Sequence, residues 1–150
     1  MTNTATAATP RSVVVERELP HAPEKIWRAL TQPHLIQEWL MQSDFRPQVG
    51  HKFTFRAPAN PHWNGVTACE VLIVEPLKRL SYTWNATGDE AATGPMTTVT
   101  WTLTPVAGGT HLKMVHDGFV LPDDRFAYEA MSPGWSRIAE RIGSVAAELV

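Results

Sequence analysis

The C-terminal third of the chain, residues 97–150, constrains the fold more than any other segment. Apolar and polar residues alternate in two runs, Val99 to Leu103 and Leu112 to His116, on either side of the turn signal Gly108-Gly109. This pattern predicts an antiparallel hairpin. A long segment with one apolar stripe follows: Met131, Trp135, Ile138, Ile142, Val145 and Leu149. The stripe predicts an amphipathic helix packed on a curved sheet, with room between them for a small ligand.

The preceding residues supply the rest of the sheet and two short helices. Val13 to Leu19 alternates as a strand does, and Pro23 is well placed at the first position of a helix. Pro33 ends that helix and begins another. Alternation of period two begins near Ser43, and strand patterns follow around residues 53–55, 66–75 and 80–84. The order β-α-α-β-β-β-β-β-β-α predicts one α+β domain.

Turns and helix ends carry further signals. Residues 87–95 are expected to form a polar loop. Leu121 to Asp124 predicts a turn into the last helix, with an aspartate as its N-cap. Ser132-Pro133 leaves two alternatives open, because it either interrupts this helix or restarts it with Ser132 as the cap.

Length and composition favour one soluble domain. The 150 residues are 43% hydrophobic and 19% charged, which suffices for a buried core, and we expect a disordered tail over residues 1–11 and a single domain over residues 12–150. A net charge of −2 gives no reason to expect nucleic acid as a partner. The sequence shows neither a signal peptide nor an apolar run long enough for membrane insertion. A single cysteine, Cys69, fits a reducing compartment, so we expect a cytoplasmic protein.

Tryptophan is abundant for a chain of this length. The six residues are Trp27, Trp39, Trp63, Trp84, Trp101 and Trp135. One interpretation is that they fill the core, because aromatic side chains bury large areas. The other is that several line a ligand pocket, since pockets are mostly apolar with a few polar groups. Trp63 lies in a loop and either caps the mouth of such a pocket or covers the edge of the core.

The histidines and the cysteine follow no motif of a metal or catalytic site. The six histidines lack the ligand spacing of a zinc site. Cys69 has no sequence signature of a nucleophile and is expected to be a small buried residue. Gly108-Gly109 is not followed by a helix, so it does not form a phosphate-binding loop. We expect no metal and no cofactor.

Three polar residues are expected to point toward the core because they share strand parity with apolar neighbours. They are Arg17, Glu70 and His116. In one interpretation they are structural: Arg17 and Glu70 lie at strand ends or beside a bulge, and His116 is hydrogen-bonded in the core. In the other they orient the polar end of a ligand, because a buried charge must be paired or lie in a wet cavity. His116 could also transfer a proton, since the ordinary pKa of histidine is about 6.5.

Motifs spread over residues 12–150 together resemble one superfamily. They are Arg17, residues 22–31 (APEKIWRALT), residues 33–39, Val49-Gly50, Phe53 to Phe55, residues 71–76, residues 79–84 (RLSYTW), residues 98–105, Gly108 to Thr110, His116 to Phe119, and Gly134-Trp135. Their order and spacing resemble the START-like superfamily, also called SRPBCC or Bet v 1-like. Within it they look most like the branch of activator of heat-shock-protein-90 ATPase homologues. The resemblance implies a helix-grip fold, in which a curved antiparallel sheet wraps around a long C-terminal helix and leaves a cavity between them.

The resemblance implies a cavity without implying one activity. The superfamily includes lipid and sterol carriers, polyketide cyclases, hydroxylase subunits, hormone receptors and co-chaperone modules. We expect binding or carriage of a small hydrophobic or aromatic molecule, such as a lipid or polyketide. The expected ligand-binding residues are Trp39, Phe53, Phe55, Trp63, Glu70, Trp84, Trp101, Met114, His116, Phe119, Met131 and Trp135. Two alternatives stay open, a cyclase- or hydrolase-like enzyme with His116 as general acid or base and a protein-interaction module of the co-chaperone kind. Homodimerisation also stays open.

Overall fold

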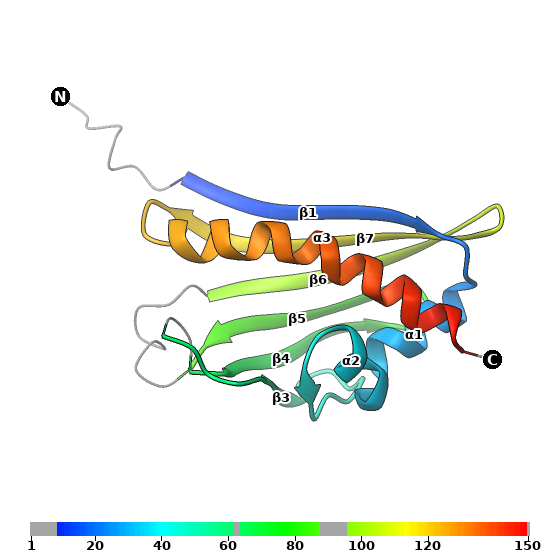
Figure 1. Cartoon of the computed structure of the whole chain (residues 1–150), viewed down its shortest axis with the longest axis horizontal. Coiled ribbons are helices and arrows are strands. Elements are labelled where there is room, and N and C mark those ends of the chain that lie inside the picture. The colour runs from blue at the N-terminus through cyan, green and yellow to red at the C-terminus, as the bar shows by residue number, and fades with distance from the viewer. Residues whose placement is uncertain (1–8, 62–63, 88–95, 150) are drawn as a thin grey trace.

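The computed structural model describes residues 9–61, 64–87 and 96–149. Its elements follow the order expected from the sequence (Figure 1). They are β1 (Thr9–Leu19), α1 (Pro23–Thr31), α2 (Pro33–Trp39), β2 (Gln42–Ser43), β3 (Lys52–Arg56), β4 (Val66–Glu75), β5 (Arg79–Ala86), β6 (Met96–Val106), β7 (Gly109–Leu121) and α3 (Arg125–Ala147). Strand β1 begins at Thr9, inside the tail expected over residues 1–11, and residues 1–8 lie outside the described part of the chain.

The strands form one seven-stranded antiparallel sheet in the order β1-β7-β6-β5-β4-β3-β2. From β2 to β7 each strand pairs with the next along the chain. Strand β1 pairs with β7, from Thr9 opposite Leu121 to Leu19 opposite Thr110. The first and last strands of the chain therefore lie side by side, and the expected α+β helix-grip fold is confirmed (Figure 1).

Helix α3 crosses one face of the sheet, over β1 and β7, and α1 and α2 pack beside it (Figure 1). The alternation that predicted β6 as a strand places Trp101 and Leu103 on this inner face, where both are buried. From the helix, Trp135 and Ile142 are also buried, and the Trp135 ring packs on that of Trp101. Burial of apolar side chains from both partners is what holds α3 on the sheet.

Helix α3 continues through Ser132-Pro133 without interruption. The Ser132 hydroxyl donates to the Tyr128 carbonyl oxygen at 2.7 Å instead of capping a new helix. A proline removes one hydrogen bond of a helix, and packing of the apolar stripe on the sheet keeps the helix intact here. Asp124 holds the N-cap position as expected, although its carboxylate accepts from the Val120 N–H at 2.8 Å rather than from the first turn of α3.

The two short helices begin at prolines and are joined by one buried hydrogen bond. Pro23 and Pro33 lie in the first turn of α1 and α2, where the missing N–H has no helical partner to lose. The Trp39 indole nitrogen donates to the Ala29 carbonyl oxygen at 2.7 Å. This bond fixes α2 against α1 and turns the Trp39 ring toward the sheet, which positions it for the site described below.

Candidate functional site

Four tryptophans meet where the helices cover the sheet, and we call Trp39, Trp84, Trp101 and Trp135 the tryptophan cluster. The ring centroid of Trp101 lies 5.6 Å from that of Trp39 and 5.8 Å from that of Trp135, both edge to face. The Trp84 and Trp135 centroids are 5.4 Å apart. Edge-to-face pairs add about 0.5–1.5 kcal/mol each beyond the burial of area. The cluster therefore connects α2, β5, β6 and α3 at the centre of the grip.

His116 of β7 is fully buried beside this cluster, and both of its ring nitrogens are hydrogen-bonded. The Trp135 indole N–H donates to Nδ1 at 2.9 Å, and Nε2 lies 2.7 Å from the Thr97 hydroxyl oxygen. That hydroxyl donates its one hydrogen to the Trp84 carbonyl oxygen at 2.6 Å. The imidazole must therefore donate through Nε2, which defines a neutral tautomer with a proton on Nε2 and a lone pair on Nδ1.

The surroundings of His116 oppose its protonation. Burial lowers the pKa of His116 from 6.5 to about 3, against a smaller opposite effect of the Asp117 charge. A proton added to Nδ1 would also face the donor N–H of Trp135. His116 lies inward as the strand parity predicted, and it occupies the role of a hydrogen-bonded core residue. Neither nitrogen is free to exchange a proton with a ligand near neutral pH.

A second polar pair in the same interior did not emerge from the sequence. The Trp101 indole N–H donates to the hydroxyl oxygen of Tyr82 at 2.9 Å. Tyr82 is 2% exposed, and burial raises the pKa of its hydroxyl, which therefore stays protonated. Tyr82 shares its strand parity with Trp84, but the partner across the sheet depends on register, which one strand alone does not reveal.

Most of the other expected ligand-binding residues lie on the inner side of the sheet or on α3. Those that are buried are Phe53, Phe55, Met114 and Phe119, and Met131 is half-buried against the core. Phe53 and Phe55 pack around Tyr82, with centroids 5.3 and 5.8 Å from its ring. Trp63 lies outside the described residues. The structure thus brings nearly all of the expected apolar residues together in the core.

Glu70 is the exception, because the inward orientation expected for it is wrong. Its neighbours Cys69 and Val71 are buried, so Glu70 lies on the opposite face of β4. The register shifts between Val71 and Ile73. Beyond this irregularity the parity reverses, and Val74 packs on the core although it has the same parity as Glu70. The prediction for Glu70 was wrong because it used the parity of apolar residues that lie beyond the bulge, where the strand faces are reversed.

Glu70 instead contributes to an open groove of about 370 Å³. The groove is lined by Asp44, Lys52, Phe53, Thr54, Arg56, Ala68, Cys69, Glu70, Thr83 and Asn85. Lys52, Thr54 and Arg56 alternate with the buried Phe53 and Phe55 along β3, which places the groove on the outer face of the sheet. Most of the residues that line it are polar and none belongs to α3, so it is distinct from the cavity expected between sheet and helix.

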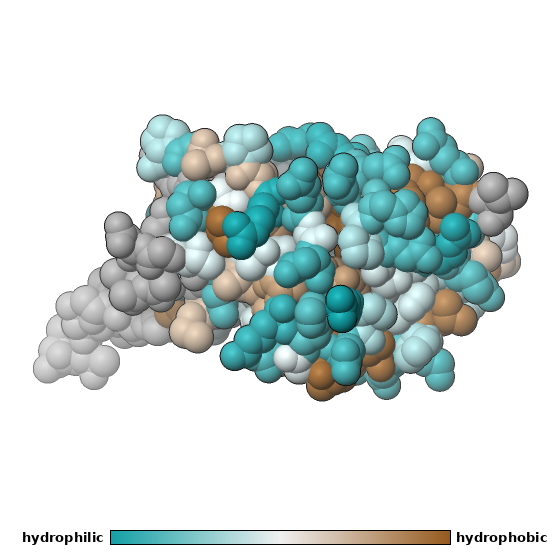
Figure 2. Space-filling model, turned by 90° about the horizontal axis from the view of Figure 1, so that it is seen from below, coloured by the Kyte–Doolittle hydropathy of each residue, from teal (hydrophilic) through white to brown (hydrophobic). Residues whose placement is uncertain are grey.

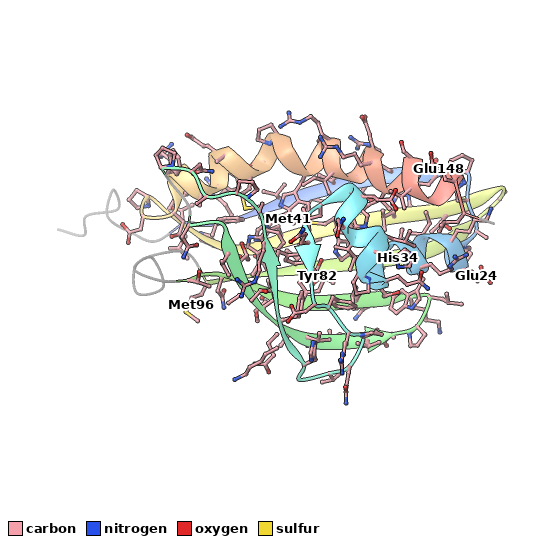
Figure 3. The ribbon with its side chains drawn as sticks, turned by 60° about the horizontal axis from the view of Figure 1, so that its bottom comes forward. Glu24, His34, Met41, Tyr82, Met96 and Glu148 are labelled. Carbon is pink, nitrogen blue, oxygen red and sulfur yellow. The ribbon has the colours of Figure 1, made fainter. Side chains whose placement is uncertain are left out.

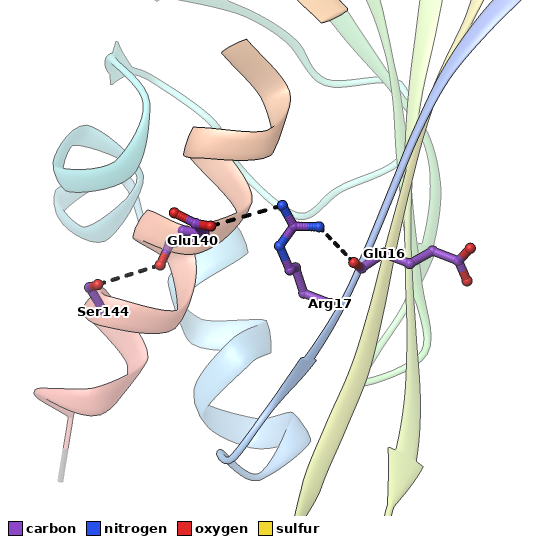
Figure 4. A network of polar contacts seen from close by, with 4 residues as sticks. All are labelled: Glu16, Arg17, Glu140 and Ser144. Atoms are coloured by element: carbon purple, nitrogen blue, oxygen red, sulfur yellow. Dashed lines mark hydrogen bonds and ion pairs between the residues drawn. The ribbon is translucent and has the colours of Figure 1, made fainter. Parts of the chain in front are cut away.

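Arg17 does face the helix side of the sheet, at the edge strand β1. One of its guanidinium nitrogens lies 4.0 Å from a carboxylate oxygen of Glu140 in α3, and another donates to the Glu16 carbonyl oxygen at 2.8 Å (Figure 4). The Arg17 and Glu140 side chains are 33% and 72% exposed. Arg17 therefore joins β1 to α3 at the rim and does not reach the tryptophan cluster.

The surface gives few further signals. The face seen in Figure 2 is mostly hydrophilic, with hydrophobic residues in separate small groups. No helix within the described ranges is long and apolar enough to cross a membrane. Those same ranges contain no group of three or more His, Cys, Asp or Glu side chains placed to hold a metal ion.

A curved antiparallel sheet closed over a long C-terminal helix, with two short helices after the first strand, defines a helix-grip protein of the START-like or SRPBCC superfamily. Residues 20–147 match the profile of the family described as activator of Hsp90 ATPase homolog 1-like protein, and the chain belongs to that family. Proteins with this fold commonly bind hydrophobic ligands. A search among curated proteins found no match.

Solved structures share the fold over nearly the whole chain. Protein MLL2253 from Mesorhizobium loti is 51% identical, with a TM-score of 0.84 over 93% of this chain and 99% of that one. Protein BH1534 from Bacillus halodurans is 26% identical, with a TM-score of 0.75 over 92% and 99%. DynU16, from the dynemicin biosynthetic locus, is 24% identical, with a TM-score of 0.74 over 91% of this chain and 47% of that one, and shows the fold alone.

Proposed function

We propose that the protein binds a small, largely apolar or aromatic molecule between its sheet and α3. The observation that carries this proposal is the tryptophan cluster, whose rings line the interior of a fold that commonly accommodates hydrophobic ligands. Planar ligands gain from such rings because aromatic faces and edges attract one another beyond the burial of area. Phe53, Phe55, Met114 and Phe119 extend the apolar lining.

The hydrogen bonds of His116 favour binding over catalysis by this residue. A general acid or base must exchange a proton with the reacting molecule near its own pKa. Both ring nitrogens of His116 have protein partners, and the pKa of about 3 lies far below neutral pH. A cyclase-like reaction at this site would require another proton donor or acceptor. The family alone does not supply one, because a fold does not determine an activity.

Titration of the tryptophan fluorescence tests this proposal. We expect a saturable change on addition of a lipid, a flavonoid or an aromatic polyketide, because a bound molecule alters the surroundings of the cluster. Met131→Ala shortens a half-buried side chain of α3 that packs on the core, and we expect affinity to fall by about three- to tenfold. Ser144→Ala, on the exposed side of α3, is the matched control and should bind as the wild type does.

The outcomes separate the alternatives. Absence of a saturable response to all three classes of compound would contradict the proposal for those classes. Turnover of a bound polyketide that persists in His116→Gln would point to an enzyme that uses another residue. Specific capture of a protein partner without small-molecule binding would favour the interaction module instead.

Location and assembly belong to the same proposal. We infer a cytoplasmic protein, because its single cysteine, Cys69, is buried and has no second cysteine with which to form an internal disulfide. Homodimerisation can be tested by light scattering on the purified protein.

A further inference from the structure

The hydroxyl of Tyr82 is deeply buried, and its hydrogen has no acceptor among the described residues. Its oxygen accepts the Trp101 indole N–H at 2.9 Å. Among residues 9–61, 64–87 and 96–149 the Trp101 N–H is the one hydrogen-bond partner of this hydroxyl, so its oxygen is paired while its hydrogen meets no acceptor. The side chain is 2% exposed, so the hydrogen does not face bulk water. Tyr82, labelled in Figure 3, has its ring 6.1 Å from that of Phe45, which follows β2 in the chain.

The neighbouring polar side chains, His116 and Thr97, donate every hydrogen that they carry to an acceptor, whereas Tyr82 does not. His116 accepts from Trp135 and donates to Thr97, whose hydroxyl donates to the carbonyl oxygen of Trp84. That chain of hydrogen bonds ends on a backbone oxygen. The corresponding chain from Trp101 ends on the Tyr82 hydroxyl, which still has a hydrogen to donate. A buried donor without an acceptor costs about 1–3 kcal/mol, and native proteins seldom keep one without a reason.

The rings around the Tyr82 side chain set the polarity of its surroundings. Phe45, Phe53 and Phe55 lie with ring centroids 6.1, 5.3 and 5.8 Å from the Tyr82 ring. Among the described residues, Trp101 is the one whose indole N–H donates a hydrogen bond to Tyr82. No charged side chain is part of this group of rings. The surroundings therefore favour an apolar, aromatic molecule that carries a neutral acceptor, over an ionised one.

We propose that Tyr82 is the polar anchor of the ligand site, and that its hydroxyl donates to a carbonyl oxygen on an otherwise apolar aromatic ligand. This inference rests on the proposed function and narrows it from hydrophobic molecules in general to aromatic ketones and related acceptors. The high pKa of Tyr82 agrees with the donor role, since the hydroxyl keeps its hydrogen over the physiological range. Trp101, by donating to the same oxygen, orients the hydroxyl and strengthens it as a donor.

A matched pair of probes tests the inference. Fluorene and 9-fluorenone are rigid, planar and similar in size, and only fluorenone has a carbonyl oxygen. We expect wild-type protein to bind fluorenone about three- to tenfold more tightly than fluorene, as measured by quenching of tryptophan fluorescence. Tyr82→Phe removes only the hydroxyl, and we expect it to abolish this preference. Tyr128→Phe changes the other tyrosine of the chain, on α3, and should preserve the preference.

A second readout does not depend on the variant. The carbonyl stretching band of bound fluorenone should move to lower frequency than in an apolar solvent, because a donated hydrogen bond weakens the C=O bond. Equal preference for fluorenone in wild type and Tyr82→Phe, or an unshifted carbonyl band, would overturn the role of Tyr82 while leaving binding itself intact. Binding of neither compound to the wild type would instead overturn the proposed function for planar aromatic molecules, and this inference with it.

Discussion

Acidification below about pH 6.5 should destabilise the protein through His116. The unfolded chain takes up a proton on this histidine near pH 6.5, whereas the folded protein resists protonation until about pH 3. Between these values the unfolded state binds one more proton than the folded state. Stability therefore falls as the pH falls through this window, and the contribution of His116 is fully present only above pH 6.5.

The size of the effect follows from the two pKa values. Their difference, 6.5 minus about 3, corresponds to about 5 kcal/mol over the whole window. At pH 4.5 about 3 kcal/mol of this has been lost, which is a large part of the roughly 5–15 kcal/mol that stabilises a typical domain. Asp44, whose pKa is lowered from 3.8 mainly by the Thr54 backbone N–H, contributes only at more acidic pH.

Urea unfolding at pH 7 and pH 4.5, followed by tryptophan fluorescence, measures this loss. His116→Gln is the control, because an amide can accept from Trp135 and donate to Thr97 without titrating. We expect the loss between the two pH values to be about 3 kcal/mol smaller in this variant. Equal losses in both proteins would refute the reasoning. So would an NMR titration of the His116 ring in the folded wild type with a midpoint near 6.5, which needs no variant.

Three further changes test the packing around the site by the same urea assay. Trp135→Ala should lower the free energy of unfolding by about 3–5 kcal/mol, since it opens a cavity and removes the donor to His116. A decrease below about 1 kcal/mol would contradict the central position of this ring in the core. Gly109→Ala should lower the free energy of unfolding more than Gly108→Ala does. A Cβ at position 109 would overlap a backbone oxygen of β1. Gly108 has a φ of +80° with open space around it, so Gly108→Ala should lower the free energy of unfolding by only about 1–2 kcal/mol. The reverse order would show that β1 and the β6–β7 turn are not in this contact. A double-mutant cycle on Arg17 and Glu140 should give a coupling below about 1 kcal/mol, because the pair is exposed, and a larger value would mean that the rim pair is better shielded than its exposure indicates.

Much of the fold was predictable because the chain repeats simple periodicities. Alternation through Val99 to Leu103 identified β6 and its buried face, and the apolar stripe from Trp135 to Leu149 identified the packed side of α3. The order of elements followed from these patterns together, and the family followed from the resemblance of the motifs spread over residues 12–150. The path of α3 through Pro133 was not decided by the sequence, since a local helix breaker competes there with tertiary packing that only the folded protein supplies.

The site was less predictable than the fold, for two physical reasons. Glu70 was assigned to the wrong face because a single irregularity between Val71 and Ile73 reverses parity along β4. The bond between Tyr82 and Trp101 depends on the register of two strands, and the sequence of either one does not contain that register. By contrast, the inward orientation of His116 followed from its own strand, because β7 is regular from Leu112 through His116.

The indole N–H signals in a ¹H–¹⁵N NMR spectrum test the central claim most directly, because Trp39, Trp101 and Trp135 each donate an assignable hydrogen bond inside the molecule. Saturating addition of 9-fluorenone should shift the Trp101 and Trp135 signals more than the backbone amides of Lys52 and Glu70, whose side chains line the outer groove. The opposite result, shifts at the outer face around Lys52 and Glu70 with unmoved indole signals, would contradict binding between the sheet and α3.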